Sequence, residues 1–592
     1  MRKSIATVSV SGTLTDKLEA IAAAGFDGVE IFENDLITCP HSPEDIRSMA
    51  ADLGLRIDLY QPLRDFEAVP DATLEHNLRR AERKFRLMER LGAELLLVCS
   101  SVSPEAVGDD ELAAAQLRLL AGRAAEHGVR VAYEALAWGR HVNEYLHAWR
   151  IVRMADHPAL GTCLDSFHIL SRGSDPIGIE AIPGEKVFFL QLADAPLLAM
   201  DVLQWSRHYR CFPGQGNFDL RGLVRHVLNT GYTGPLSLEV FNDVFRQADA
   251  GRTARDAMRS LIALEESLDP RAPGPVVPTG FAFTELATDD AAPLGEVLGV
   301  LGFSRTGSHP TKPVELWEQG GARILLNATG AAPALAAIGL ESPDPEASAR
   351  RAGELLAPVL PRERGPREAP LDAIAAPDGT QIFFCRTGHP DHSDWTGDFP
   401  RAPAGDAAPA APAPGRLTHI DHVALAQPWH HFDEASLFYR GVLGLRPLES
   451  MEVPDPYGLL RSRAMSSPDG AVRMVLNLAR VGAQQAPWQH VALASEDIRA
   501  TVRRLRAVRP DLLLPIPGNY YDDLEARYEI GSEPRELGLL YDRDEHGEFL
   551  HLYTITLGSM FFEIVQRIGG YRGYGASNAP IRLAVQHART RP

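Results

Sequence analysis

Residues 160–169 read LGTCLDSFHI, an apolar run that leads into an aspartate and a histidine. Short runs of this kind, bounded by turn residues, are typical of buried strands. Helical patterns such as TLEHNLRRAERKFRLMERLG at residues 73–92 lie between most of these runs. Seven more runs of the same texture occupy residues 4–10, 28–32, 56–62, 94–100, 129–135, 186–195 and 234–241. Eight strands alternating with helices across residues 1–270 predict an α/β TIM barrel.

The alternative for this half of the chain is an open, doubly wound sheet. Nucleotide-binding sheets of that kind carry a GxGxxG turn after the first strand. No such turn follows residues 4–10. The barrel is therefore the favoured interpretation.

The pattern of predicted strands and helices changes after residue 270. A Pro-rich stretch predicts a linker at 271–280, and RAPAGDAAPAAPAPGR predicts a second one at 401–416. Residues 281–400 and 417–592 both read as short strands with interspersed helices, the second at larger scale. This βαβββ order of predicted elements recurs about four times, which indicates α+β repeats arranged as two module pairs.

Composition limits the partners and the compartment. The net charge of −19 argues against nucleic acid or an acidic membrane as the partner. The five cysteines are scattered and form no CxxC, which favours a reducing cytoplasm. The N-terminus has no long apolar region, and no run of about 18 apolar residues occurs, so we expect neither a signal peptide nor a membrane span.

Four predicted barrel strands end in oxygen ligands. Carboxyl ends of parallel strands meet on the face where barrel active sites are built, so these groups should converge. Three carboxylates and one amide form a hard ligand set that favours Mg²⁺, Mn²⁺ or Co²⁺. A single such acid could simply be a buried partner of an arginine, but four on one face are harder to explain that way. The residues are Glu134, Asp165, Gln191 and Glu239.

The same segment resembles the xylose isomerase-like barrels. RCFPGQGNFDL at 210–220 is similar to their R-x-x-PGxG-x-x-D loop, and LDSFH is similar to their D-x-x-H element. The resemblance implies that His168 faces the substrate as a general acid or base. Many relatives have histidine where this chain has Gln191, which shifts the preference further toward hard cations.

Two arginines lie on predicted loops of the same face. Arg64 follows the third strand and Arg210 precedes the eighth. Each could hold a substrate carboxylate with a fork of N–H donors, or each could form an ordinary surface salt bridge. His208 is also expected to reach the site, in a role that the sequence does not define.

The last 176 positions contain a second candidate site. His422, His490 and Glu563 lie on predicted strands at corresponding positions of repeated modules. Two histidines and one carboxylate form the facial triad of non-haem Fe²⁺ enzymes, and other divalent ions also fit. A lone histidine in a strand is usually structural, but three ligands in register with a repeat are a stronger signal.

Residues 280–575 resemble the vicinal-oxygen-chelate fold and, within it, 4-hydroxyphenylpyruvate dioxygenase. The resemblance rests on stretches such as LPIPGNYYDDLEAR and GSMFFEIVQR. Glu285 stands where the first module would need histidine, which agrees with a metal-free first half. His551 replaces a usual glutamine, LNLAR lacks a usual glutamate, and IRLAVQHART offers no phenylalanine to close the pocket. These departures imply an altered substrate pocket.

A barrel of this kind followed by a dioxygenase-like region resembles the bacterial two-part 3-dehydroshikimate dehydratases. The resemblance implies a metal-dependent lyase that makes protocatechuate in quinate and shikimate catabolism. Residue spacing alone leads only to metal-assisted enolisation of a polyhydroxy carbonyl compound. A sugar or inositol-type isomerase is therefore one alternative, and an active Fe²⁺ dioxygenase in the C-terminal region is another. That region is also a candidate for assembling a homo-oligomer.

Overall fold

The structure is a computed structural model that describes residues 1–330, 332–388, 394–400, 415–478 and 488–590. The chain divides into two compact units, Met1–Pro273 and Gly274–Pro592, and each is described here by itself. Most of the predicted linker at 401–416 lies outside the described residues, because these resume at Gly415.

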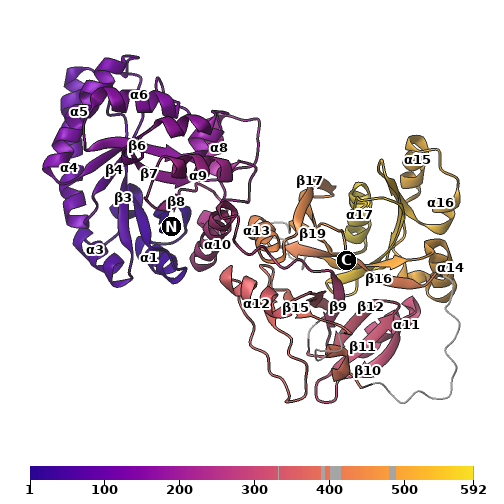
Figure 1. Ribbon diagram of the computed structural model, residues 1–592. Coiled ribbons are helices and arrows are strands. Elements are labelled where there is room, and N and C mark those ends of the chain that lie inside the picture. Colours follow the sequence, from indigo (N-terminus) through magenta and orange to yellow (C-terminus); the bar gives the residue numbers. More distant parts are fainter. Residues whose placement is uncertain (331, 389–393, 401–414, 479–487, 591–592) are drawn as a thin grey trace. The chain divides into compact units, whose positions relative to one another are not determined.

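The first unit is a closed barrel of eight parallel strands (Figure 1). The barrel closes because β1 pairs in parallel with β8, for instance through Ile5 and Leu238. This pairing confirms the predicted TIM barrel and excludes the open sheet. The strands are β1 (Lys3–Ala6), β2 (Gly28–Phe32), β3 (Arg56–Leu63), β4 (Leu95–Cys99), β5 (Arg130–Glu134), β6 (Leu160–Asp165), β7 (Val187–Leu192) and β8 (Leu236–Leu238).

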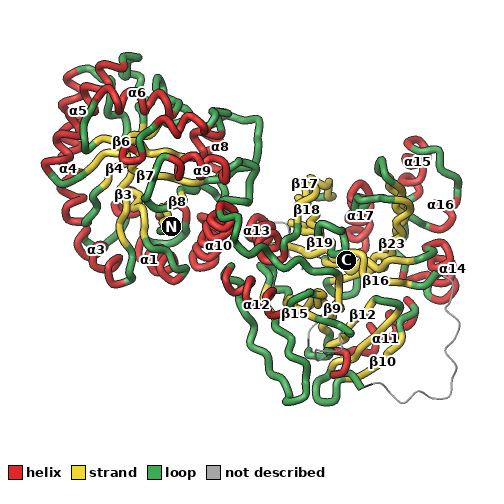
Figure 2. Tube along the Cα trace, in the orientation of Figure 1, coloured by secondary structure: helices red, strands yellow, loops and turns green. Residues whose placement is uncertain are grey.

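Helices form the outer layer of the barrel (Figure 2). Their polar N-terminal caps explain where several begin: the Asp109 carboxylate accepts two backbone N–H groups at the start of α5, for example. The helices are α1 (Leu14–Ala23), α2 (Glu33–Ile37), α3 (Pro43–Asp52), α4 (Asp71–Leu91), α5 (Asp110–Glu126), α6 (Tyr145–Ala155), α7 (Ser166–Leu170), α8 (Val202–His208), α9 (Leu220–Asn229) and α10 (Ala250–Leu268).

One predicted strand changes conformation part of the way along. The run at 160–169 is a strand only as far as Asp165, and the helix α7 begins at Ser166. The reason is local, since the Asp165 carboxylate accepts the backbone N–H groups of Phe167 and His168 and so caps the helix. This turn brings His168 back beside Asp165.

The second unit contains two sheets of related topology. Seven strands follow the order β10-β11-β12-β9-β13-β15-β14, and eight follow β17-β18-β19-β16-β20-β23-β22-β21. In both sheets the first long strand pairs in parallel with one neighbour and antiparallel with the other, as β9 does with β12 and β13 and β16 does with β19 and β20. The predicted repetition of vicinal-oxygen-chelate modules is therefore confirmed.

The elements of the second unit are as follows. The first sheet comprises β9 (Gly280–Ala287), β10 (Ser304–Ser308), β11 (Val314–Gln319), β12 (Ala322–Asn327), β13 (Ala334–Glu341), β14 (Ala373–Ala375) and β15 (Gln381–Cys385), with helices α11 (Ala291–Leu301) and α12 (Pro345–Glu354). The second comprises β16 (Leu417–Gln427), β17 (Arg446–Asp455), β18 (Gly458–Ser466), β19 (Arg473–Leu478), β20 (Gln489–Ser495), β21 (Leu540–Arg543), β22 (Gly547–Tyr553) and β23 (Met560–Gly569), with helices α13 (Phe432–Leu443), α14 (Ile498–Val508), α15 (Gly518–Arg527), α16 (Glu533–Leu537) and α17 (Ala579–Thr590). Among the described residues, no helix has both the length and the apolar character needed to cross a membrane.

Candidate active site and second metal centre

The four predicted oxygen ligands of the barrel lie at the carboxyl ends of neighbouring strands. Glu134 and Asp165 are the last residues of β5 and β6, and Glu239 directly follows β8. Gln191 is the penultimate residue of β7. All four side chains are buried. A carboxylate oxygen from Glu134, another from Asp165 and a ring nitrogen of His168 lie within 4.8 Å of one another.

Arg210 lies inside this acidic cluster. Its Nη1 donates to the Asp165 carboxylate at 2.8 Å and to the Glu239 carboxylate at 3.1 Å. Its guanidinium carbon is 4.6 Å from the centre of the Phe167 ring, and only 1% of the residue is exposed. The loop position of Arg210 predicts an arginine that grips substrate. The structure instead shows a buried cation that pairs with the acids, because its segment bridges to Asn242 through Tyr209 and to Asp194 through Cys211, in the segments that follow β8 and β7.

The cluster holds more negative than positive charge. Burial, together with the neighbouring Asp165 and Glu239, raises the pKa of Glu134 well above its usual value. Burial also raises the pKa of Glu239 to about 7, although Arg210 acts to lower it. One carboxylate oxygen of Glu134 is buried and has no hydrogen-bond partner in the described chain. A divalent cation fits this site, because it would supply the missing charge and a partner for that oxygen.

Gln191 is oriented by a buried network. Its Nε2 donates to the Glu30 carboxylate at 2.6 Å, and Gln61 donates to the same oxygen at 2.8 Å. The Ser237 hydroxyl donates to the other oxygen of Glu30. Since the amide nitrogen of Gln191 is engaged in this way, its oxygen, which accepts the Cys163 thiol at 3.3 Å, is the atom that would serve as a ligand. Sequence reasoning missed Glu30, although an acid inside the apolar run GVEIF was a visible signal.

His168 is buried and uncharged. Its Nδ1 accepts the backbone N–H of Ala137 at 3.1 Å, while Nε2 lies 3.7 Å from Asp165 and 3.3 Å from Arg210. Burial is the main cause that lowers the pKa of His168 to about 3. The Ala137 contact fits the tautomer with the proton on Nε2, whereas the Arg210 contact fits the tautomer with the proton on Nδ1, because a guanidinium can only donate. Nε2 is the ring nitrogen that faces the cluster, and the Asp165 carboxylate beside it favours the protonated ring.

The remaining predicted substrate residues differ in position. Arg64 is half-buried, and its guanidinium forms no hydrogen bond or ion pair with the residues that the structure describes. Its charge reaches the cluster, because it contributes to lowering the pKa values of His168 and Glu239. Burial and the nearby Arg64 also lower the pKa of Arg207, so these arginines lie close enough to repel one another. His208 does not join the site, since its ring is 42% exposed and bonds Asp243 at 2.8 Å.

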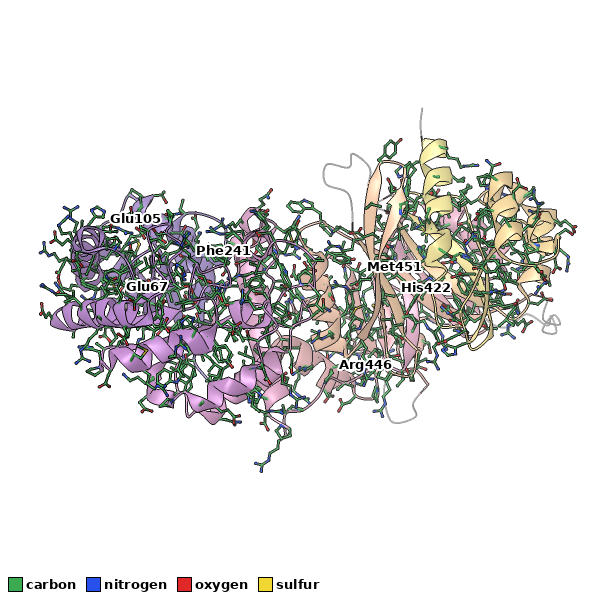
Figure 3. The ribbon with its side chains drawn as sticks, turned by 90° about the horizontal axis from the view of Figure 1, so that it is seen from above. Glu67, Glu105, Phe241, His422, Arg446 and Met451 are labelled. Atoms are coloured by element: carbon green, nitrogen blue, oxygen red, sulfur yellow. The ribbon has the colours of Figure 1, made fainter. Side chains whose placement is uncertain are left out.

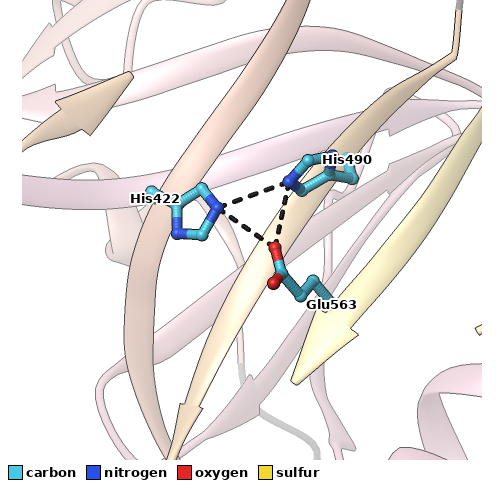
Figure 4. Close-up of side chains that lie close together, drawn as sticks. All are labelled: His422, His490 and Glu563. Carbon is cyan, nitrogen blue, oxygen red and sulfur yellow. Dashed lines mark hydrogen bonds and ion pairs between the residues drawn. The ribbon is translucent and has the colours of Figure 1, made fainter. Parts of the chain in front are cut away.

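The three predicted ligands of the second unit lie together on one face of its larger sheet (Figure 4). His422, His490 and Glu563 come from the adjacent strands β16, β20 and β23. Each histidine Nε2 lies 3.1 Å from the same Glu563 oxygen, and the two Nε2 atoms are 3.3 Å apart. The three residues are buried and can hold one divalent ion.

Neighbouring groups hold these ligands in place. Asp421 bonds Nδ1 of His422 at 2.8 Å and forms a bidentate pair with Arg567. His551 bonds the second oxygen of Glu563 at 2.7 Å, which gives a role to the histidine that replaces the usual glutamine. Ligands supported in this way keep their orientation and basicity. Sequence reasoning missed Asp421 and Arg567, because the pairing of a strand residue with one 146 positions away has no local signal.

The smaller sheet has no equivalent centre among the residues described. Glu285 on β9 is half-buried and accepts a hydrogen bond from Asn327 at 2.6 Å. The two groups of metal-ligating side chains found in the described residues both lie elsewhere.

Comparisons with known proteins match this architecture. The family model for the xylose isomerase-like TIM barrel covers residues 18–264. The model for the N-terminal part of hydroxyphenylpyruvate dioxygenase covers 273–384, and that of the glyoxalase, bleomycin resistance protein and dioxygenase superfamily covers 419–525. Fold and site thus define a xylose isomerase-like barrel joined to dioxygenase-like modules.

Comparison with individual relatives narrows this class of protein to one family. The chain is 46% identical to a 3-dehydroshikimate dehydratase of Pseudomonas putida, over 99% of this chain and 98% of the relative. It therefore belongs to the 3-dehydroshikimate dehydratase family. A solved xylose isomerase-like TIM barrel/4-hydroxyphenylpyruvate dioxygenase fusion protein is 44% identical, with a TM-score of 0.89 and 99% of each chain covered. A 4-hydroxyphenylpyruvate dioxygenase from a Pseudomonas species is 28% identical over 50% of this chain and 91% of its own.

Proposed function

We propose that the barrel dehydrates 3-dehydroshikimate to protocatechuate, with a divalent cation held by Glu134, Asp165, Gln191 and Glu239. The observation that supports this most is the buried cluster of three carboxylates with an unpartnered Glu134 oxygen, in a chain that matches a 3-dehydroshikimate dehydratase over its full length. An all-oxygen ligand set of this kind favours Mg²⁺, Mn²⁺ or Co²⁺.

The reaction needs two proton transfers at neighbouring carbons. When bound, the cation would draw electron density from the ketone oxygen and acidify the adjacent C–H. His168 takes that proton at Nε2 in the tautomer that leaves this nitrogen unprotonated, and the Asp165 carboxylate, 3.7 Å away, stabilises the imidazolium that forms. The β-hydroxyl then leaves with a proton returned by His168, as water. Tautomerisation of the remaining ring ketone to a phenol gives the aromatic product, so the overall change is the loss of one water molecule.

Two arginines near the cluster would hold the substrate carboxylate. The Arg64 guanidinium has no hydrogen-bond or ion-pair partner among the described residues, and Arg207 lies close enough for mutual repulsion. An anion between them removes this repulsion and forms charge-assisted hydrogen bonds. Arg210 has a different role. Its donors bind the Asp165 and Glu239 carboxylates, so it holds these carboxylates in position.

The test of this proposal is product formation by the full-length protein. We expect 3-dehydroshikimate to give the absorbance of protocatechuate in the presence of Mg²⁺, Mn²⁺ or Co²⁺, and Glu134→Gln to abolish it. The exposed Glu19→Gln is the matched control and should keep full activity. A sugar isomerase, the alternative reaction on such a barrel, would give no aromatic product from this substrate.

For the second unit we infer one divalent ion, such as Fe²⁺, at His422, His490 and Glu563. The close approach of three ligand atoms around one point supports this inference. We expect metal analysis of the full-length protein to lose one equivalent in His490→Ala while dehydratase activity persists. We also expect little oxygen uptake with 4-hydroxyphenylpyruvate, because the pocket departs from that of the dioxygenases. Brisk uptake would make the chain an enzyme with two reactions.

We propose a cytoplasmic location, which follows from the composition. We also propose that the protein forms a homo-oligomer through the second unit, which follows from the repeated sheets. Size-exclusion chromatography with light scattering on the full-length protein tests the second.

A further inference from the structure

Phe241, which is labelled in Figure 3, lies three residues beyond the end of β8 and therefore on the carboxyl face of the barrel. Its side chain belongs to a small apolar cluster with Ala6 and Val8. The ring of Phe32 packs edge-on against it, with 6.2 Å between the ring centres. Only 8% of Phe241 is exposed, so this packing holds its ring in place.

Three guanidiniums lie over this ring. Those of Arg210, Arg246 and Arg207 are 5.5, 5.6 and 5.8 Å from its centre, which is within the range of a cation–π attraction. Arg207 lies in the last turn of α8, and Arg246 lies in the short 3₁₀ helix Phe245–Gln247. Among the described residues, neither of these two guanidiniums forms a hydrogen bond or an ion pair. The aromatic ring is therefore what holds them.

The two carboxylates that flank Phe241 in sequence have other partners. Asp243 bonds His208 at 2.8 Å, and Glu239 accepts from Arg210 at 3.1 Å. A carboxylate beside the other two arginines would neutralise them and use their N–H donors. An aromatic ring holds a guanidinium by its face and leaves those donors free for another anion.

The cations near Phe241 lie close together. Burial and the charges of Arg64 and Arg246, among others, lower the pKa of Arg207. The guanidinium of Arg64 also lacks a hydrogen-bond or ion-pair partner in the described part of the chain. A small oxyanion would remove the repulsion among these three groups and accept their free donors.

We propose that Phe241 is a positioning residue for substrate binding, whose ring holds Arg207 and Arg246 so that they form one carboxylate site with Arg64. This inference rests on the proposed function and adds Arg246 to it as a third binding group. The ring restricts both side chains before the substrate arrives, so less freedom is lost when the carboxylate binds. The effect belongs in KM rather than in kcat, because none of these groups carries a proton to or from the reacting carbons.

The first test keeps the shape of the ring and weakens the negative charge of its face. Phe241 is replaced in the full-length protein by 4-fluoro-, 3,5-difluoro- and 3,4,5-trifluorophenylalanine. We expect KM for 3-dehydroshikimate to rise with each added fluorine, to at least about threefold for the last, while kcat changes by less than about twofold. A ring that only fills space would give no such trend, so a flat KM across the series would overturn the proposal.

Ordinary substitutions give the second test. We expect Phe241→Leu to raise KM about 5–30-fold, and Phe241→Tyr, which keeps the ring, to stay within about threefold of the natural protein. Phe26→Leu is the matched control, because Phe26 is 5% exposed and precedes β2 at the opposite end of the barrel. Arg246→Met should raise KM about 3–5-fold, whereas Arg255→Met, at an exposed position of α10, should not. Normal KM in Phe241→Leu or in Arg246→Met would contradict the proposal.

A binding measurement separates this proposal from the reaction. Shikimate has the carboxylate of the substrate but a hydroxyl in place of the ketone, so it is titrated calorimetrically into the full-length protein without turnover. We expect trifluorination of Phe241, and also Phe241→Leu, to weaken shikimate binding by the same factors as they raise KM. A natural protein that makes no protocatechuate would refute the proposed function, and the shikimate titration would still decide the role of Phe241. Absence of shikimate binding, or equal binding with and without the fluorines, would overturn that role.

Discussion

Replacing Arg210 by methionine should destabilise the barrel far more than an ordinary surface change. The side chain is 1% exposed and its guanidinium bonds both Asp165 and Glu239, so methionine fills part of the space but leaves two buried carboxylates without their partner. Breaking a buried pair by removing one member typically costs about 3–5 kcal/mol. We therefore expect amides of β6 and β8 to exchange hydrogen about 10²–10⁴-fold faster when they exchange through opening of the barrel.

The assay is native-state hydrogen exchange on metal-depleted full-length protein, which reports on the barrel separately from the second unit. Arg246→Met is the control, because Arg246 is exposed and its guanidinium stacks on Phe241 at 5.6 Å without an ion pair among the described residues. It should change stability by no more than about 0.5 kcal/mol. Adding Glu239→Gln to Arg210→Met should restore part of the loss, since one unpaired charge disappears. A loss below about 1 kcal/mol for Arg210→Met would refute the view that this cation holds the acids together.

Three further changes test the parts of the site separately. His168→Asn should lower kcat roughly 10²–10⁴-fold with KM little changed, because a positioned proton carrier is lost; a fall of less than about threefold would assign the proton transfer to another group. Arg64→Ala should raise KM for 3-dehydroshikimate about 10–150-fold, which is the effect of losing a charge-assisted hydrogen bond of about 1.5–3 kcal/mol; an unchanged KM would place the carboxylate elsewhere. Glu30→Ala should weaken metal binding in the barrel about 10–100-fold by releasing the Gln191 amide, and normal affinity in calorimetric titration with Mn²⁺ would show that Gln191 needs no such support.

The barrel and its acids could be predicted from sequence because the signals are local. Each strand is an apolar run, and Glu134, Asp165 and Glu239 all fall at the end of one. Since parallel strands in a barrel share one carboxyl face, their convergence follows from the fold itself. The same logic applies to His422, His490 and Glu563, which occupy matching strands of a repeated module.

What the sequence could not provide is the direction of side chains on irregular segments. His208 and Arg210 are two residues apart at the end of α8, yet one pairs with Asp243 in solvent and the other is buried among carboxylates. Arg582 shows the same limit. The sequence draws attention to the phenylalanine that the C-terminal helix lacks, whereas the burial of its arginine becomes visible only when α17 packs beside β17.

Contacts between residues on different strands are the second feature that could not be predicted from the sequence. His551 meets Glu563 because β22 pairs antiparallel with β23, and Gln191 meets Glu30 across the barrel interior, 161 residues away in sequence. Such contacts depend on the register and curvature of the sheet, which no local pattern encodes.

The central claim is that the acidic cluster of the barrel uses a divalent cation to dehydrate 3-dehydroshikimate. The most direct measurement is a titration of metal-depleted full-length protein with Mn²⁺ while protocatechuate absorbance is followed, for the natural sequence and for Glu134→Gln. The account predicts that the natural protein gains activity from a negligible baseline to a plateau, and that Glu134→Gln stays inactive at every concentration. Full turnover without metal, or equal activation of Glu134→Gln, would contradict it.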